Sequence, residues 1–187
     1  MAVKKIDKRV TKTKNNIYNA LIELLQEKQI EEIRVSEICK NASINRTTFY
    51  AHFKDKHDLF NTYIKSIQQE LIKNLENVKR QKQVKQYYLE ITSILINYME
   101  EKKDIYKIIT NHKQYDIIIH TIQENIKNVL LTNNTDDKIG TIPRDFITTF
   151  YIGGIVNIGM DWVLNRPTYS KQTILKHMEE LISNAFK

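Results

Sequence analysis

The chain is poor in the residues that interrupt regular structure: its 187 residues include only 4 glycines and 2 prolines. Strands need turn-forming residues at short intervals, and such punctuation is missing from most of the sequence. Isoleucine, leucine, lysine, glutamate and asparagine dominate long stretches without breakers. The sequence therefore predicts an all-α protein, and its length is ample for a sizeable core.

Cysteine and long apolar runs are also scarce. The single cysteine, Cys39, cannot form an internal disulfide, so nothing indicates an oxidising compartment. No apolar run reaches the roughly 18 residues of a membrane span. The first residues, MAVKKIDKRVTK, lack the hydrophobic segment of a secretion signal. These absences predict a cytoplasmic protein without a membrane partner.

Motifs of catalysis and metal binding are missing as well. The sequence has no Gly-rich phosphate loop, no Ser/His/Asp motif and no paired carboxylates with an obvious pocket. His112, His120 and His177 lack the spacing of metal ligands, and no cysteine lies near them. We therefore expect no catalytic residues, no metal and no cofactor, and the chain is not expected to be an enzyme.

Positive charge is in excess and is concentrated at the N-terminus. The formal net charge is +7, with a sequence pI of about 9.3. Residues 1–14 contain six lysines and arginines against a single acidic residue, Asp7. A basic arm of this kind suits an anionic polymer such as nucleic acid. A solvated tail explains the same charges equally well.

Apolar residues that recur every three or four positions predict a series of about nine helices. The expected helices cover residues 13–28, 36–42, 45–53, 55–80, 84–99, 102–110, 114–132, 144–164 and 171–186. The polar stretch 133–141 is the clearest loop, and Pro143 suits the first turn of the helix after it. Ser170 is expected to cap the last helix. We expect an N-terminal domain of residues 1–60 and a helical C-terminal domain of residues 61–187.

The short helices around residues 33–52 have the composition of a helix-turn-helix that reads DNA. Phe49 and Phe53 lie one turn apart and should pack the second short helix against its neighbours. Arg46 offers a fork that fits guanine or phosphate, and Asn45 suits the helix N-cap. The turn Ala42-Ser43-Ile44 has the length that such motifs use. The exposed arc would hold Thr47, Thr48, Tyr50 and Ala51.

This stretch resembles the DNA-binding domain of the TetR family of bacterial regulators over roughly residues 8–68. The family pattern is Val/Thr-x-x-Ile-Ala, a turn of Ala-Gly-Val-Ser, then Thr-Phe-Tyr-x-His-Phe-x-x-Lys-x-x-Leu. Here it stands as VSEIC at 35–39, ASIN at 42–45 and TFYAHFKDKHDL at 48–59. Two residues depart from it. Ser43 replaces the turn glycine, so a left-handed conformation is expected there, and Thr47 replaces a small residue.

The resemblance implies a DNA-binding role for the polar residues of the motif. Base edges would be contacted by Arg46, Thr47 and Thr48, and phosphates by Ser36, Tyr50, His52 and Lys56. The full candidate set is Ser36, Asn45, Arg46, Thr47, Thr48, Tyr50, His52, Lys54 and Lys56. The alternative for His52 is a partly buried structural histidine, and the alternative for Lys54 and Lys56 is that they are ordinary surface charges. Cys39 fits a small core residue.

The resemblance also implies a C-terminal body that dimerises through its last two helices and holds a small-molecule effector. Gly153, Gly154 and Gly159 fit close approach of a partner helix, or equally close packing inside one subunit. Candidate pocket residues, none of them assigned, are Tyr87, Tyr88, Tyr98, Tyr106, His112, Tyr115 and His120.

The implied function is a ligand-responsive repressor that binds a near-palindromic operator in double-stranded DNA as a homodimer. Two alternatives stay open. One is a transcriptional activator or co-regulator of the same fold. The other is a helical protein-interaction module without specific DNA binding.

Overall fold

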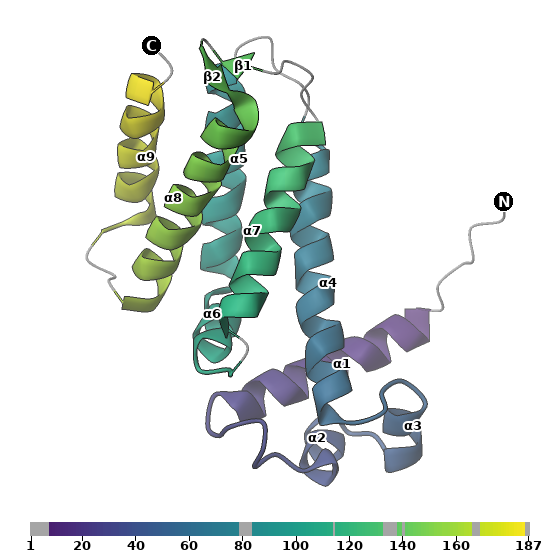
Figure 1. The fold of residues 1–187 in the computed structure, drawn as a ribbon. Helices are drawn as coiled ribbons and strands as arrows, with labels where there is room; N and C mark the ends of the chain where they lie inside the picture. Colours follow the sequence, from purple (N-terminus) through teal and green to yellow (C-terminus); the bar gives the residue numbers. More distant parts are fainter. Residues whose placement is uncertain are drawn as a thin grey trace, which may run out of the picture. The chain divides into compact units, whose positions relative to one another are not determined.

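A computed structural model describes residues 8–78, 84–113, 115–132, 138–139, 141–165 and 169–185. In these residues all regular structure is helical except for one small hairpin (Figure 1). The helices are α1 (Lys8–Leu25), α2 (Val35–Asn41), α3 (Arg46–Tyr50), α4 (Lys56–Glu76), α5 (Val84–Glu101), α6 (Lys103–Thr110), α7 (Tyr115–Thr132), α8 (Arg144–Asn165) and α9 (Lys171–Ala185). The all-α prediction is confirmed, with nine helices in the described part of the chain.

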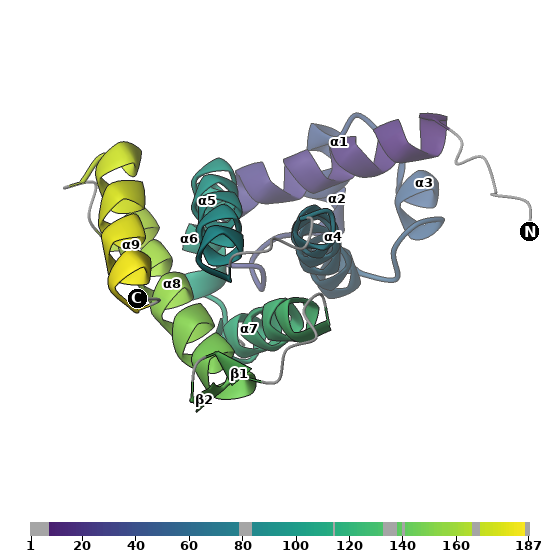
Figure 2. The ribbon, with the colours of Figure 1, turned by 90° about the horizontal axis from the view of Figure 1, so that it is seen from above.

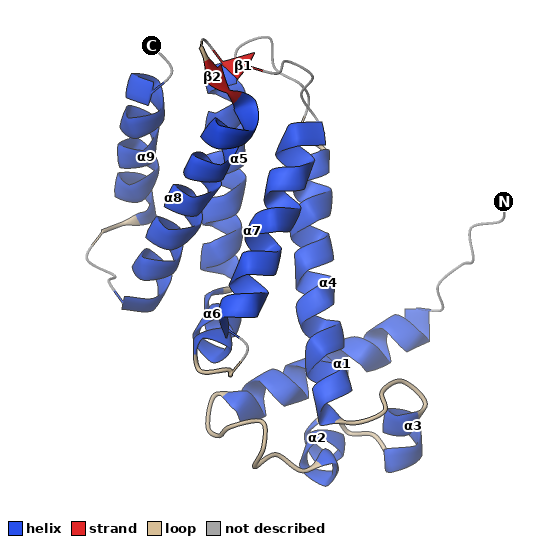
Figure 3. Ribbon diagram, in the orientation of Figure 1, coloured by secondary structure: helices blue, strands red, loops and turns tan. Residues whose placement is uncertain are grey.

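The hairpin corrects one detail of the sequence prediction. The stretch expected to be a plain loop contains β1 (Lys138–Ile139), which pairs antiparallel with β2 (Ile142–Pro143), as the two red arrows in Figure 3 show. Pro143 therefore ends a strand instead of lying in the first turn of α8. The ring of proline fixes φ at a value that both positions accept, so its identity could not separate them.

The prediction of a basic N-terminal arm is wrong in part. α1 begins at Lys8, so the basic residues from there to Lys14 are helical and not part of a tail. The start of the expected arm, residues 1–7, lies outside the described residues. Helix α1 thus carries at least four cations in its first two turns, and most of these positions are exposed.

The chain forms two compact units, Met1–Ile67 and Gln68–Lys187. The boundary expected after residue 60 and the one observed after Ile67 both fall inside α4. This helix is therefore shared: its first turns belong to the first unit and its last turns to the second.

The first unit packs α1, α2, α3 and the start of α4 around one apolar core. Ile17 and Leu21 of α1, Ile38 of α2, Phe49 of α3 and Leu59 of α4 all contribute to it, and all five are fully buried. A helix of five residues such as α3 is marginal in isolation. Its conformation therefore depends on the aromatic anchor that joins it to this core.

The second unit is a helical body in which α8 packs against α5 and α7, and α9 packs against α5. Figure 2 shows α5, α8 and α9 next to one another in a view along the helices. Gly159 of α8 is explained by this packing, because a Cβ atom there would press on Met99 and Ile96 of α5. The alternative of close packing inside one subunit therefore holds for Gly159.

Helix α8 is apolar enough, over Arg144–Leu164, to cross a membrane by length and composition alone, and no other helix in the described residues is. The sequence shows no uninterrupted apolar run here because Asp145, Asn157 and Asp161 lie within the helix. One side of α8 packs against α5 and α7. A helix that is apolar on several faces is expected where more than one face is packed.

Candidate nucleic-acid interface

The turn between α2 and α3 has the backbone that the sequence predicts. Ser43 has φ of 54°, so the expected left-handed residue is confirmed. Its N–H donates to the carbonyl of Lys40 at 3.1 Å, and the N–H of Ile44 donates to Cys39 at 3.0 Å. These two bonds close the end of α2 and aim the chain into α3.

Asn45 caps α3, as expected. Its Oδ1 accepts the backbone N–H of Thr48 at 2.7 Å and the hydroxyl of Thr48 at 2.9 Å. The hydroxyl hydrogen of Thr48 is therefore in use, while the lone pairs of its oxygen remain. In this arrangement Thr48 can accept a hydrogen bond from a base amino group but cannot donate one to a phosphate.

Two phenylalanines hold α3 to the core of the first unit. Phe49 and Phe53 are buried, and their rings lie 5.9 Å apart. The ring of Phe53 also lies 5.9 Å from that of Tyr18 on α1, which in turn lies 4.7 Å from Tyr63 on α4. Aromatic pairs of this kind contribute roughly 0.5–1.5 kcal/mol each beyond their buried area. The short helix is thus tied to α1 and, through Tyr18, to α4.

The opposite side of α3 is exposed. Arg46, Thr47 and Ala51 are all exposed, and Tyr50 keeps 57% of its surface accessible while its ring meets the edge of Phe49. The arc predicted from the sequence is therefore exposed at Thr47, Tyr50 and Ala51, whereas Thr48 is half-buried. Arg46 adds a guanidinium to this side of the helix. Such groups suit hydrogen bonds to base edges and phosphates.

The remaining candidates lie at the ends of the motif. Ser36, in the first turn of α2, and His52, after α3, are half-buried, while Lys54 is exposed. The main-chain N–H of Lys54 donates to Asp58 at 2.9 Å, so its backbone is fixed while its ammonium extends outward. The thiol of Cys39 is buried, and burial raises its pKa, which suits a structural cysteine.

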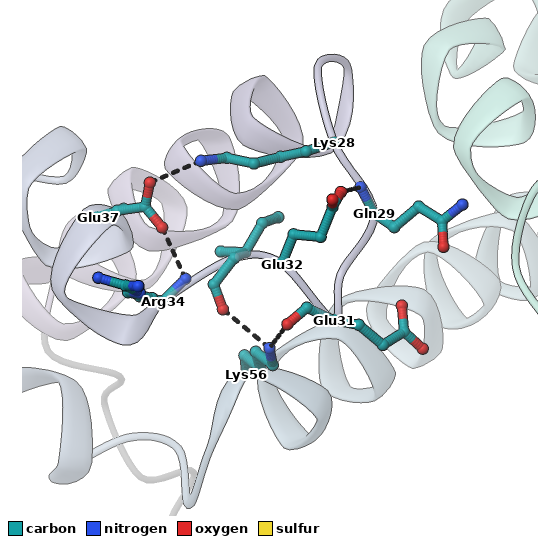
Figure 4. A network of polar contacts seen from close by, with 8 residues as sticks. Lys28, Gln29, Glu31, Glu32, Arg34, Glu37 and Lys56 are labelled. Carbon is teal, nitrogen blue, oxygen red and sulfur yellow. Dashed lines mark hydrogen bonds and ion pairs between the residues drawn. The ribbon is translucent and has the colours of Figure 1, made fainter.

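Lys56 has a structural contact that the sequence did not indicate. Its ammonium donates to the carbonyls of Glu31 at 2.6 Å and Ile33 at 2.9 Å, as Figure 4 shows. The first turn of α4 is thereby tethered to the loop between α1 and α2. A phosphate contact by Lys56 stays a prediction, and removing this side chain would also loosen the fold.

The same loop is fixed by Glu37. One carboxylate oxygen of Glu37 accepts from the ammonium of Lys28 at 2.6 Å, and the other accepts the N–H of Arg34 at 2.8 Å (Figure 4). The Lys28 bond, followed by the Arg34 bond, holds the pKa of Glu37 below its ordinary value. The second bond is one half of a capping box, with the acid three residues after the N-cap. That spacing was the signal available in the sequence.

The first unit carries an excess of positive charge, which makes it the better candidate for binding an anionic partner. Residues 8–67 carry eleven lysines and arginines against seven aspartates and glutamates. The four cations at the start of α1 are part of this excess. A positively charged unit attracts a phosphate backbone whatever its sequence.

The candidate pocket residues of the second unit differ in how deeply they are buried. Tyr87, Tyr88, Tyr98 and Tyr106 are buried, Tyr115 and His112 are half-buried, and His120 is exposed. Burial raises the pKa of Tyr106 to about 12, so its phenol is neutral near pH 7. The polar interior therefore consists mainly of neutral hydroxyls.

Comparison with known proteins identifies both units. Residues 17–63 match the family described as "Bacterial regulatory proteins, tetR family", and residues 86–184 match that described as "Transcriptional regulator C-terminal region". A protein of Bacillus subtilis (strain 168), "Uncharacterized HTH-type transcriptional regulator YxbF", is 37% identical over 73 residues, or 38% of this chain. The chain aligns with only 19% of that relative's length.

Solved structures agree with this fold over nearly the whole chain. "Dihydroxyacetone kinase operon activator DhaS" has a TM-score of 0.69 at 20% identity, covering 93% of this chain and 96% of its own. A "Putative TetR-family transcriptional regulator" from Syntrophomonas wolfei has a TM-score of 0.75 at 12% identity, covering 94% of this chain and 95% of its own. At such identities the likeness concerns the fold.

Proposed function

Because this chain belongs to the TetR family of bacterial regulatory proteins, we propose that it is a ligand-responsive repressor that binds a near-palindromic operator as a homodimer. The observation that carries the proposal is the exposed polar arc of α3, held in place by the buried rings of Phe49 and Phe53. A bacterial protein with this role works in the cytoplasm, where the DNA is.

The polar groups on and around α3 have different roles in binding DNA. Arg46 and Thr47 read base edges in the major groove, and Thr48 accepts from a base amino group. Tyr50, His52, Lys54 and Ser36 position the unit on phosphates, with Lys56 at the start of α4. A five-residue helix makes few base contacts, so high specificity requires two half-sites.

The second half-site comes from a second copy of the chain. Helices α8 and α9 line an apolar groove whose exposed residues include Phe146 and Phe150, which keep 68% and 77% of their surface, and Leu181. Gly154 lies in this groove, and a Cβ atom there would meet open space within the chain. Large apolar side chains exposed together mark an interaction surface. Pairing this face with itself gives a two-fold dimer.

Regulation follows from unequal binding. An effector that binds one arrangement of the second unit more tightly shifts the protein toward it, and α4 is continuous between that unit and the reading unit. In a repressor the favoured arrangement has the lower operator affinity. A reporter gene behind the operator, measured with and without the protein, distinguishes repression from activation.

The proposal is tested by selecting a bound sequence from a random DNA pool and measuring affinity for it. The logarithm of the affinity should fall linearly with the logarithm of the salt concentration. Arg46→Ala and Thr47→Ala should alter the preferred bases, and loss of a bidentate contact of Arg46 should reduce discrimination by about 1–3 kcal/mol. Lys54→Ala should weaken binding to all duplexes alike.

Lys103→Ala is the matched control, because this exposed lysine begins α6 in the second unit. It should leave both affinity and base preference unchanged. If the pool yields no preferred sequence, or if the three variants of the first unit bind like the wild type, the assignment of α3 as the reading helix is wrong.

A further inference from the structure

One cation is buried inside the second unit. Arg144, the first residue of α8, is only 4% exposed and is the one charged side chain among the buried residues of the described chain. Its Nη1 and Nη2 atoms are shielded from solvent, and neither has a hydrogen-bond partner among the residues that the structure describes. A guanidinium keeps its charge at any physiological pH. Buried charges of this kind are normally paired.

The polar groups beside Arg144 come from α8 and α5. Thr148, one turn further along α8, is fully buried, and its hydroxyl shares a hydrogen bond of 3.0 Å with that of Tyr88 on α5. Burial raises the pKa of Tyr88, while Thr148 and the nearby charge of Arg144 act in the opposite direction. The phenol is therefore neutral, and it supplies no counter-charge for Arg144.

In the same interior, the neighbouring hydroxyls of Thr92 and Tyr151 have hydrogen-bond partners within the protein. Thr92 on α5 donates to the carbonyl of Tyr88 at 2.7 Å, and the hydroxyl of Tyr151 on α8 bonds both to that carbonyl and to Thr92. These groups are satisfied by the protein itself. The terminal nitrogens of Arg144, one turn nearer the start of α8 than Thr148, have no such partner among the described residues.

We propose that Arg144 binds the carboxylate of a monoanionic effector together with Thr148, whose hydroxyl accepts from Tyr88 and donates its own hydrogen to the ligand. The two terminal N–H groups of a guanidinium match the two oxygens of a carboxylate. One buried cation is neutralised by one negative charge, whereas a doubly charged phosphate would leave an excess charge in the interior. The proposal rests on the proposed function only in treating the second unit as the effector-binding one.

The test measures binding without DNA. The full chain is heated in sodium acetate, in sodium chloride of equal ionic strength and in acetamide, the neutral isostere of acetate. A ligand that binds the folded state raises the melting temperature in proportion to the logarithm of its concentration once binding is saturated. Acetate should raise the melting temperature of the wild type above the value in chloride, and acetamide should not.

Three variants locate the effect. Arg144→Met should abolish the acetate-specific rise, and Thr148→Val should weaken acetate binding about tenfold, the effect of losing one hydrogen bond to a charged group. Lys176→Met, which removes an exposed cation from α9, should respond to acetate like the wild type. Should Arg144→Met fail to fold, Thr148→Val and the contrast between acetate and acetamide still decide the question.

The proposal is overturned if acetate and chloride act alike on the wild type, if acetamide equals acetate, or if Arg144→Met keeps the acetate response. Stabilisation by phosphate at lower concentration than by acetate would also overturn it, because the charge balance would then be wrong. Since no readout involves DNA, loss of operator binding would count against the proposed function and not against this site.

Discussion

Ser43 shows at the scale of a single residue how a fold can keep a locally unfavourable conformation. A left-handed backbone costs an L-residue with a Cβ atom about 1–2 kcal/mol. Ser43 adopts it because the hydrogen bonds from Ser43 and Ile44 to the end of α2 require that path. The side chain is exposed, so no packing offsets the strain.

Replacing Ser43 with glycine should therefore stabilise the protein. Glycine removes the strain but loses about 0.5–1 kcal/mol of backbone entropy on folding, so the net gain should be about 1 kcal/mol or less. Urea unfolding of the two proteins measures it. Ser43→Ala is the control, because alanine is strained in the same way and should bring no gain. A more stable alanine variant would show that the strain is not the cause.

At the scale of a single element, helix α4 is capped by the carboxylate of Asp55, the residue just before its first. Oδ1 of Asp55 accepts the N–H groups of His57 and Asp58, both at 2.8 Å. The Asp58 bond, and after it the His57 bond, lowers the pKa of Asp55. A lowered pKa in the folded state means that Asp55 stabilises the fold fully above its ordinary pKa of 3.8. This contribution disappears as the pH falls through the folded value.

The stability of the wild type should accordingly fall with pH more steeply than that of Asp55→Asn in the acid range. Asparagine keeps an acceptor for the cap but does not titrate. Urea unfolding between about pH 3 and pH 7 compares the two slopes. Glu37 titrates in both proteins, so the difference isolates Asp55. Parallel slopes would contradict the assignment, and Asp55→Ala should lose about 1 kcal/mol at neutral pH.

The elements of the fold could be predicted well where the signal was local. Asn45 and Ser170 were identified as caps from residue type alone, and the bonds from Thr48 to Asn45 and from Thr173 to Ser170 confirm both. The hairpin was not predicted, since a pair of two-residue strands has no periodicity to detect. Leu181 of α9 stays exposed although it continues the apolar stripe of its helix, because it lines the groove.

The candidate site was predictable to a similar extent. The exposed arc of α3 could be predicted because Phe49 and Phe53 fix which side faces the core. The tether of Lys56 could not be predicted, because its acceptors are main-chain carbonyls 23 and 25 residues earlier and carry no side-chain signature. The burial of Arg144 was not predicted either, because an arginine that follows a loop normally lies at the surface.

The proposed dimer is tested at the scale of the whole molecule. Phe150→Glu places a charge at the most exposed position of the groove between α8 and α9. Central apolar residues of an interface typically contribute about 2–4 kcal/mol, so the dimer dissociation constant should rise by about thirtyfold or more. Sedimentation equilibrium measures it, and operator affinity should fall in parallel.

Ile117→Glu is the matched control for this change. Ile117 on α7 keeps 67% of its surface but is not among the residues that line the groove. It should leave the association state unchanged. If Ile117→Glu dissociates the protein while Phe150→Glu does not, the copies of the chain pair through another face.

The tether of Lys56 has a consequence for how this sequence can drift during evolution. Its ammonium binds carbonyl oxygens, which every amino acid provides, so the bond does not depend on which side chain stands at Glu31 or Ile33. Position 31 is exposed, and the contact persists whatever side chain stands there, whereas position 33 is constrained separately by burial. The contact therefore requires a particular side chain at one position only, that of Lys56.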